Sequence, residues 1–440
     1  RNAEDAQNMI DTAEGAHAEI VTSLQRLREL AVQSANSTNS AVDRSFIQKE
    51  ASQLLNEINR IASDTEWNGM PLIDGSFDDK NIQVGANVGQ TIAIDIADTQ
   101  ASKIGNYVIR GSSKMTAVGA NPAANSIAGG DTIIAGFAGT DTVTASAGDD
   151  AKEFAKQINA LSDNTGVTAK AATHALLSSL DTAGTLSIAF GKNGTVGTSV
   201  ASQITATATI NDTTDLTALR DAINEISGGT GVTASFFEGD LSKIMLKDHD
   251  GDDIVIGNSS HSTSSATFSV QAYDFFGDSI GGADAATVIE STNDSITVSG
   301  EVQLSSNQAF AVTSTVADDF FGASGATDTA YQSSLENVGD IDLGSMVKAQ
   351  KAIDVIDGAI DMINTQRSDL GAISNRLDKT INNLTNIVEN GSASKSHIKD
   401  ANFASETSKL TKAQILNQAA TSMLAQANAS KQTVLALLQN

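Results

Sequence analysis

The densest group of residues able to do chemistry is the acidic run KDHDGDD at 247–253. It holds four aspartates: Asp248, Asp250, Asp252 and Asp253. Carboxylates bind Ca²⁺, but an EF-hand loop needs Gly at its sixth position and Glu at its twelfth. Counted from Asp248, the glycine is at the fourth position and Ser259 is at the twelfth. We interpret the run as a hairpin turn between IMLK and DIVI, with a weak cation site at Asp248–Asp253 as the alternative.

The histidines are scattered and form no HExxH motif: His17, His174, His249, His261 and His397. The chain contains no Cys, which excludes disulfides, thiolate zinc sites and cysteine nucleophiles. His17 falls on an apolar helix face, where a packed imidazole is favoured over a metal ligand or a pH switch. No nucleophile–base pair or metal-ligand spacing is present, so we expect no catalysis, no metal and no cofactor.

Composition excludes two further classes of partner. The 440 residues carry a formal net charge of −26, which repels nucleic-acid phosphates and anionic membranes. No apolar run approaches the ~20 residues of a membrane span. The length suggests about two to four domains, and with aromatics at only 4% the core must be built from aliphatic side chains.

Apolar residues at alternating spacings of three and four predict helices that pack along their whole length. The first seam is Ala3, Ala6, Ile10, Ala13, His17, Ile20, Leu24, Leu27 and Ala31. After a breaker at 34–40, the second is Ile47, Ala51, Leu54, Ile58 and Ile61. The third is Ala349, Ile353, Ile356, Ile360, Ile363, Arg367, Leu370, Ser374, Leu377, Ile381, Leu384 and Val388. Two ends with unbroken seams can bury them only by meeting, so we expect the termini to form one bundle.

The third seam and the residues that follow it lead to further predictions. ENGSASKS at 389–396 contains a Gly C-cap signal, which predicts that the helix ends there. Arg367 and Ser374 interrupt the seam, either to set helix register or, for Arg367, to pair with an acidic residue of another helix. A last amphipathic stretch follows, with no matching apolar face elsewhere: Phe403, Leu410, Leu416, Met423, Leu424, Ala427, Leu435 and Leu438.

The middle of the chain is rich in Thr, Ser, Gly, Asp and Ala and predicts strands and turns. Residues 81–96 alternate as a β-hairpin. INALSDNTGVTA at 158–169 and INEISGGTGVTA at 223–234 form an internal repeat, each preceded by a short helical pattern and leading into a strand. Further strands are expected at 267–270, 296–298 and 310–315.

Several of these stretches resemble the bacterial flagellins. LQRLRELAVQSANSTNS (24–40), the following run to IDG, IQVGANVGQTIAIDI and ATSMLAQANASKQTVLALLQ (420–439) match the helical ends and hairpin of that family, and the repeat resembles a module of its variable part. The resemblance implies a motility filament subunit of the extracellular flagellum, exported by the type III apparatus without a cleavable signal. The family's first 60-odd residues are not found here, so we expect the chain to be a fragment.

The resemblance implies an α+β multidomain fold: a long antiparallel α-helical coiled-coil rod from both termini with a β-hairpin, plus β-rich variable middle domains. We expect the N-terminal part of the rod domain with the hairpin at 1–104, a first variable α/β unit at 105–200, a second unit with a β-rich region at 201–340, the C-terminal part of the rod at 341–398, and an inner-tube helix at 399–440.

The resemblance also implies partners. These are copies of the chain itself in a helical homopolymer, an export chaperone, the cap and hook-associated proteins, and the innate-immune Toll-like receptor that senses flagellin. Arg26, Leu30 and Glu50 match family positions that contact neighbouring subunits and the receptor. None is on a seam, so each can be exposed; the alternative is ordinary surface charge at Arg26 and Glu50 and a helix-packing role for Leu30. The alternatives are a surface adhesin or glycan-binding protein acting through the middle domains, a hook–filament junction protein, and an enzyme.

Overall fold

The computed structural model describes residues 1–85, 87–116, 118–119, 122–191, 203–263, 266–277, 285–289, 294–316, 320–321, 329–400 and 402–437. The chain folds into two compact units. The first consists of Arg1–Gln7, Ile82–Ile92 and Ile373–Asn440, and the second of Asn8–Asn81 and Ala93–Ala372.

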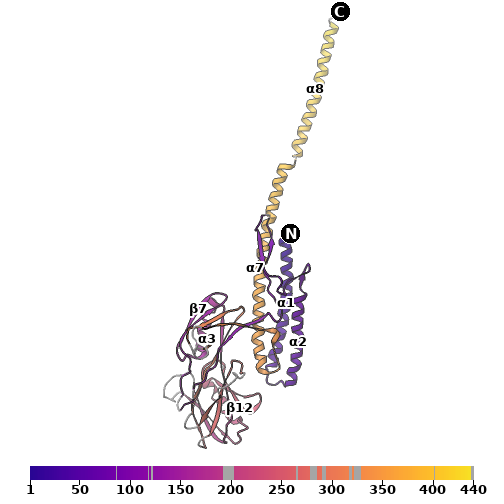
Figure 1. The fold of residues 1–440 in the computed structure, drawn as a ribbon. Coiled ribbons are helices and arrows are strands. Elements are labelled where there is room, and N and C mark those ends of the chain that lie inside the picture. The colour runs from indigo at the N-terminus through magenta and orange to yellow at the C-terminus, as the bar shows by residue number, and fades with distance from the viewer. Residues whose placement is uncertain are drawn as a thin grey trace. The chain divides into compact units, whose positions relative to one another are not determined.

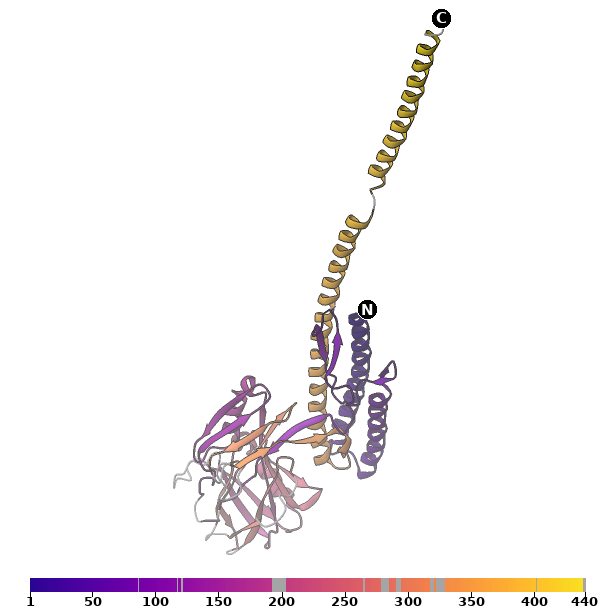
Figure 2. The same cartoon turned by 45° about the horizontal axis from the view of Figure 1, so that its top comes forward.

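Three helices form the bundle of the second unit: α1 (Asn2–Ser34), α2 (Ala41–Asp64) and α7 (Met346–Lys399), of which α1 takes part from Asn8 and α7 up to Ala372. They lie side by side in both views (Figures 1 and 2). The predicted α1 seam is at most 2% exposed from Ile10 to Ala31. A capping box starts α2, in which Ser40 and Asp43 each accept from the other's backbone N–H.

The predicted seams need two corrections. In α2 the buried residue is Leu55 and not Leu54, because a 3.6-residue period shifts the buried face relative to a strict heptad. The helix α7 does not end at ENGSASKS but continues to Lys399, with Gly391 inside it. A helical glycine costs about 1 kcal/mol relative to alanine, which a long helix can absorb. Five residues of α7 that are at most 2% exposed recur every seventh position: Ala349, Ile356, Ile363, Leu370 and Leu377. Ala352 and Ala359 are buried beside them.

Short strands connect and extend the helices. The predicted hairpin is confirmed as the two-stranded sheet of β3 (Lys80–Gln83) and β4 (Thr91–Ile94), with Ile92, Ile94 and Ile96 buried in alternation. A smaller pair, β1 (Glu66–Trp67) and β2 (Met70–Pro71), follows α2.

The described residues of the middle of the chain form three antiparallel sheets. Their strands are β5 (Gly105–Arg110), β6 (Gly130–Ala135), β7 (Thr140–Ala145), β8 (Thr168–Ser178), β9 (Gly184–Gly191), β10 (Ile204–Ile210), β11 (Val232–Phe237), β12 (Asp240–Asp248), β13 (Ile254–His261), β14 (Thr267–Tyr273), β15 (Ala285–Ile289), β16 (Ile296–Val298), β17 (Glu301–Ser306), β18 (Ala311–Ser314), β19 (Thr329–Gln332) and β20 (Ser334–Asn337). The largest sheet has the order β11-β12-β8-β17-β5-β20, with β14 joining β8 and β15 joining β14. The others are β10-β9-β13-β16 and β19-β18-β6-β7.

The internal repeat is confirmed as two copies of one helix–turn–strand unit. The first is α3 (Ala151–Asn159), α4 (Ser162–Thr165) and β8, and the second is α5 (Thr217–Glu225), α6 (Ser227–Thr230) and β11. In each, α3 or α5 packs on the strand of its own unit. The predicted strands at 267–270, 296–298 and 310–315 correspond to β14, β16 and β18.

The same side-chain clamp closes both copies. Asn159 donates to Ala169 O and accepts from Ala169 N, both at 2.8 Å, and Asn224 does the same to Ala234 at 2.9 and 2.8 Å. The turn between helix and strand contains a glycine with a left-handed backbone, φ 72° at Gly166. A Cβ there would lie 2.1 Å from the Phe137 ring, so both backbone and space require glycine.

Two helical elements complete the chain. A 3₁₀ turn, η2 (Val338–Asp340), precedes α7, and α8 (Phe403–Leu437) follows it. Helix α8 belongs to the first unit, together with the part of α7 from Ile373.

Candidate assembly and partner-contact site

Side chains of α1 and α7 pair in reverse order along the bundle. Ser34 Oγ donates to Leu343 O at 2.6 Å, Arg28 Nε to Asp357 Oδ1 at 2.5 Å, and Arg367 Nη2 lies 2.7 Å from Glu14 Oε1. Residues later in α1 contact residues earlier in α7, or in the segment just before α7. The two helices are therefore antiparallel. The expectation that the two ends of the chain share one bundle is therefore confirmed.

The polar interruption at Arg367 has a defined partner. Of the two explanations left open, the structure supports pairing with an acidic residue, since Glu14 accepts from both Nε and Nη2 of Arg367. Three residues along α1 from Glu14, His17 is 0% exposed and neither ring nitrogen has a hydrogen-bond partner. Burial, opposed by the Glu14 charge and assisted by Arg367, lowers the pKa of His17 to about 4. A neutral, packed imidazole is what the sequence favoured.

The three predicted contact residues do not share one environment. Arg26 on α1 bridges to α2, with Nη2 2.8 Å from Glu50 Oε1, and also pairs with Glu29 at 2.8 Å. The side chains of Arg26 and Glu50 are 50% and 49% exposed, so both can reach a partner.

Leu30 is different: it is 2% exposed, so the helix-packing role that was the alternative is the one observed. Helix α1 faces both α2 and α7, so its buried face is wider than one heptad seam. Met9, Val21 and Leu30 are buried beside that seam. Sequence reasoning missed this because the second helix contact adds a stripe that the spacing of three and four does not count.

Helix α8 leaves its large apolar side chains in solvent. They are more than half exposed and include Phe403, Leu410, Ile415, Leu416, Met423, Leu424, Val434 and Leu435. Leu438 lies outside the described residues. These side chains are spread around α8 and do not line one face, so the predicted amphipathic pattern is wrong for this helix. Exposed apolar side chains in this number still mark an interaction site. At the end of α7, Ile387, Val388 and Ile398 are exposed as well, so the predicted seam position Val388 is unburied in the single chain.

The acidic run 247–253 is not a hairpin turn. Strand β12 pairs with β11 and β8, whereas β13 pairs with β9 and β16, so the run passes from one sheet to another. The alternation of IMLK and DIVI predicted the strands but could not tell which neighbours they pair with. Asp253 is 2% exposed, and its Oδ2 accepts from Asn125 Nδ2 at 2.7 Å. Burial is the main cause that raises the pKa of Asp253 to about 7.

Among the described residues, no group of three or more His, Cys, Asp or Glu side chains could hold a metal ion. In the same part of the chain, no helix has the length and apolarity needed to cross a membrane.

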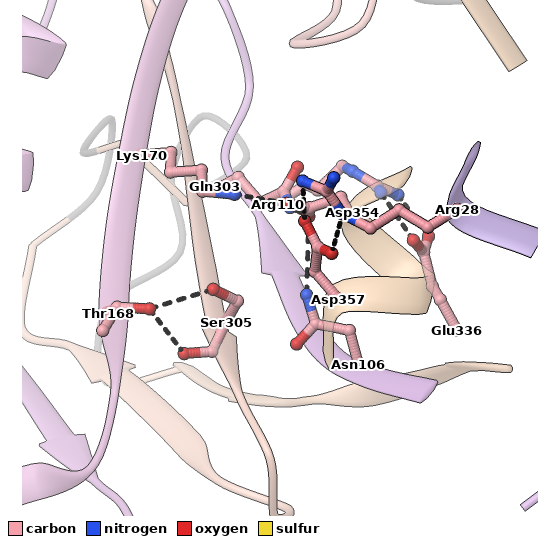
Figure 3. Close-up of polar contacts among 10 residues, drawn as sticks. All are labelled: Arg28, Asn106, Arg110, Thr168, Lys170, Gln303, Ser305, Glu336, Asp354 and Asp357. Carbon is pink, nitrogen blue, oxygen red and sulfur yellow. Dashed lines mark hydrogen bonds and ion pairs between the residues drawn. The ribbon is translucent and has the colours of Figure 1, made fainter. Parts of the chain in front are cut away.

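A polar network between α7 and the large sheet went unnoticed in the sequence. It joins Asp354 and Asp357 of α7 to residues of α1 and of several strands (Figure 3). The charges that form it are ordinary surface residue types in the sequence. Only the sheet topology brings them together.

Family models match most of the chain. The bacterial flagellin N-terminal helical region matches residues 1–78, and the bacterial flagellin C-terminal helical region matches residues 353–438. Between them, the flagellin hook IN motif matches twice, at 125–189 and 185–248, and so covers both copies of the repeat.

Curated relatives extend the similarity to the whole chain. The B-type flagellin of Pseudomonas aeruginosa is 36% identical over 443 residues, covering 100% of this chain and 87% of the relative. A flagellin of Salmonella typhimurium is 32% identical over 474 residues with the same coverage. The solved structure of FliC from Burkholderia pseudomallei is 19% identical, covers 84% of this chain and 99% of its own, and gives a TM-score of 0.33.

Proposed function

The chain belongs to the bacterial flagellin family, and from this premise we propose that the apolar surface of α8 is where copies of the chain join. Flagellins are structural proteins of the extracellular flagellar filament. This chain is a filament subunit that polymerises with itself for motility. Neither the matched proteins nor the described residues favour the adhesin alternative.

The exposed α8 helix carries this proposal. Burying a Leu or Met side chain contributes about 1.5–3 kcal/mol, and Leu416, Met423 and Leu424 are 59%, 71% and 64% exposed. Met423 and Leu424 follow Leu416 by seven and eight residues, about two helical turns along α8. A helix that exposes so much apolar surface gains free energy only when another helix covers it.

Seeded polymerisation tests the proposal. The full chain is added to flagellar filament seeds, and growth is followed by electron microscopy. Leu424→Asp places a charge among the exposed apolar side chains and is expected to abolish elongation. Ser422→Asp adds the same charge on an exposed polar position of α8 and is expected to leave elongation unchanged. Elongation by Leu424→Asp at the wild-type rate would refute the role of α8.

We assign the five segments 1–104, 105–200, 201–340, 341–398 and 399–440 as predicted from the sequence. The break between α7 and α8, at Lys399 and Phe403, supports a boundary near 398.

Further partners belong to the same proposal. An export chaperone and the cap and hook-associated proteins would contact the exposed apolar residues of α8, since these are the surface that needs cover before and after assembly. The chain is proposed to act without catalysis, metal or cofactor, in line with a structural family and with a sequence that lacks Cys and HExxH.

Arg26 and Glu50 are proposed as contacts for neighbouring subunits and for the innate-immune receptor. Two observations support this proposal: both side chains are exposed, and their ion pair fixes the Arg26 guanidinium between α1 and α2. Leu30 supports the same surface indirectly, because it is buried and packs the helix that carries Arg26.

A further inference from the structure

One face of the large sheet carries a row of polar side chains directed at α7 (Figure 3). The neighbouring strands β8, β17, β5 and β20 contribute Lys170, Gln303, Asn106 and Glu336. Gln303 is opposite Lys170 in the register of β17 and β8, and Glu336 is opposite Asn106 in that of β20 and β5. Neighbours in register point to the same side of a sheet. The residue of β5 opposite Gln303 is Arg110, four residues along the strand from Asn106, so the polar side chains of all four strands share one face of the sheet.

Asp354 of α7 is where this row converges. Lys170 Nζ contacts its Oδ1, Gln303 Nε2 donates to Oδ2 at 2.6 Å, and Asn106 Nδ2 is 3.4 Å from Oδ2. The Asp354 side chain is only 14% exposed, so its pair with Lys170 is shielded from solvent more than a surface pair would be. One carboxylate therefore bonds to three adjacent strands.

A second contact flanks the first. Arg110 binds Glu336 through two nitrogens, at 2.6 and 2.8 Å, and Lys351 of α7 lies 3.0 Å from the same carboxylate. Burial alone would raise the pKa of Glu336, but Arg110 and Lys351 outweigh it and lower that pKa. Glu336 thus stays ionised and ties β20 to the helix turn before Asp354.

The chain itself connects the sheet to the bundle through a narrow neck. Strands β5 and β20 pair up to Gly105 and Asn337, and the pairing continues outward, with Val338 N donating to Ile104 O at 2.9 Å. Lys170 and Gln303 lie on strands beyond this neck. Their bonds to Asp354 are therefore independent of the covalent connection.

Among the described residues, the two large hydrophobic clusters of the sheets contain no residue of α7. Gly358 lets β5 come close, since a Cβ there would lie 2.6 Å from Asn106 Cβ. The helix and the sheet thus meet at short range through polar groups.

We propose that Asp354 is a latch that fixes the orientation of the β-rich middle on the helical bundle, and that the β5–β20 neck acts as its hinge once the latch is broken. When the contact opens, these charged and amide groups can exchange their protein hydrogen bonds for hydrogen bonds to water, which the side chains of an apolar interface cannot do. The outer part of the subunit can therefore be released without unfolding either side. This inference does not depend on polymerisation and concerns the single chain.

Distance measurements between two spin labels test the latch. The chain has no Cys, so Glu19→Cys on α1 and Asp163→Cys on α4 give two labels at exposed positions. With Asp354 present we expect a single narrow distance distribution. Asp354→Asn keeps the shape of the side chain but removes its charge, and we expect loss of the narrow peak in favour of a broad one. Lys170→Gln, at a 57% exposed side chain, should act in the same direction without endangering folding.

The matched control is Asp369→Asn, which removes a carboxylate from the same helix. Asp369 is exposed and forms no hydrogen bond or ion pair with any described residue, so the narrow peak should persist. The exchanged pair Lys170→Asp with Asp354→Lys should restore the peak, since Gln303 Oε1 has no partner and can accept from the new lysine. Narrow distributions in both Asp354→Asn and Lys170→Gln would overturn the latch. Circular dichroism of each variant separates a swung sheet from an unfolded one.

Discussion

Arg367 and Glu14 meet across 353 residues of chain, with Nε of the arginine 2.8 Å from Oε1 of the glutamate. The pair occupies a position that the heptad pattern reserves for an apolar side chain. The other oxygen of Glu14 is buried without a partner, and so are both ring nitrogens of His17. A polar pocket thus interrupts an otherwise aliphatic bundle. A single polar position of this kind fixes helix register at some cost in stability.

The buried imidazole predicts acid sensitivity of the bundle. The unfolded chain binds a proton at His17 near pH 6.5, whereas the folded chain does so only near pH 4. Between these values the unfolded state holds more protons, so stability falls as the pH falls. His17→Leu should remove this loss, which amounts to roughly 3 kcal/mol. Urea unfolding of both chains at pH 7 and pH 4, followed by circular dichroism, measures it.

The control for this experiment is a solvent-exposed histidine. His397, exposed on α7, is replaced by leucine and should leave the pH dependence as in the wild type. Equal pH slopes for His17→Leu and the wild type would mean that His17 takes up a proton as readily in the folded bundle as in the unfolded chain, which would contradict the lowered pKa.

Two buried carboxyls predict the opposite behaviour in the β-rich middle. Burial is the main cause that raises the pKa of Asp253 to about 7 and that of Glu301 to about 8. The unfolded state loses these protons at lower pH, so stability is highest in acid and falls as the pH rises through the folded pKa values. Asp253→Asn and Glu301→Gln should each flatten this fall, on the order of 4 kcal/mol in full.

Calorimetric melting between pH 5 and pH 9 checks this prediction. Each variant should melt above the wild type at pH 9 and approach it at pH 5. Glu225→Gln, an exposed residue at the end of α5, provides the comparison and should follow the wild type throughout. Variants that melt at the wild-type temperature at pH 9 would contradict the raised pKa values of both groups.

The sequence was sufficient for features set by local periodicity. The α1 seam, the β3–β4 hairpin and the two repeat copies depend on neighbours a few residues apart, and all three were predicted. The clamp residues Asn159 and Asn224 were visible as repeated letters, although their role was not.

What the sequence could not reveal depends on distant partners. Leu30 is buried because α1 packs on two helices, and 247–253 crosses between sheets because of strand order. The bonds of Asp354 join residues 51 to 248 positions away. No spacing rule along the chain encodes such pairings, since they follow from topology.

The repeated clamp predicts equal sensitivity in the two units. Asn159→Ala leaves Ala169 N–H and C=O without their side-chain partner, and Asn224→Ala does the same at Ala234. Each loss should destabilise the middle region by about 1–3 kcal/mol. Hydrogen exchange at Ala169 and Ala234 should rise only in the matching variant. Asn211→Ala, at an exposed loop position, should change neither amide, and equal protection in all three variants would show that the clamps carry no stability.

Exposure of Arg26 and Glu50 predicts that they act in recognition and not in folding. Arg60 offers a close control, because it is equally exposed and also pairs with two acids, Glu57 and Asp64. Arg26→Ala should fold like the wild type but lose receptor signalling by the monomer, whereas Arg60→Ala should signal normally. Exchange of Arg26 and Glu50 keeps the ion pair with reversed positions. If signalling depends on a guanidinium displayed from α1, the exchange stays inactive, and if signalling survives Arg26→Ala, the predicted contact is wrong.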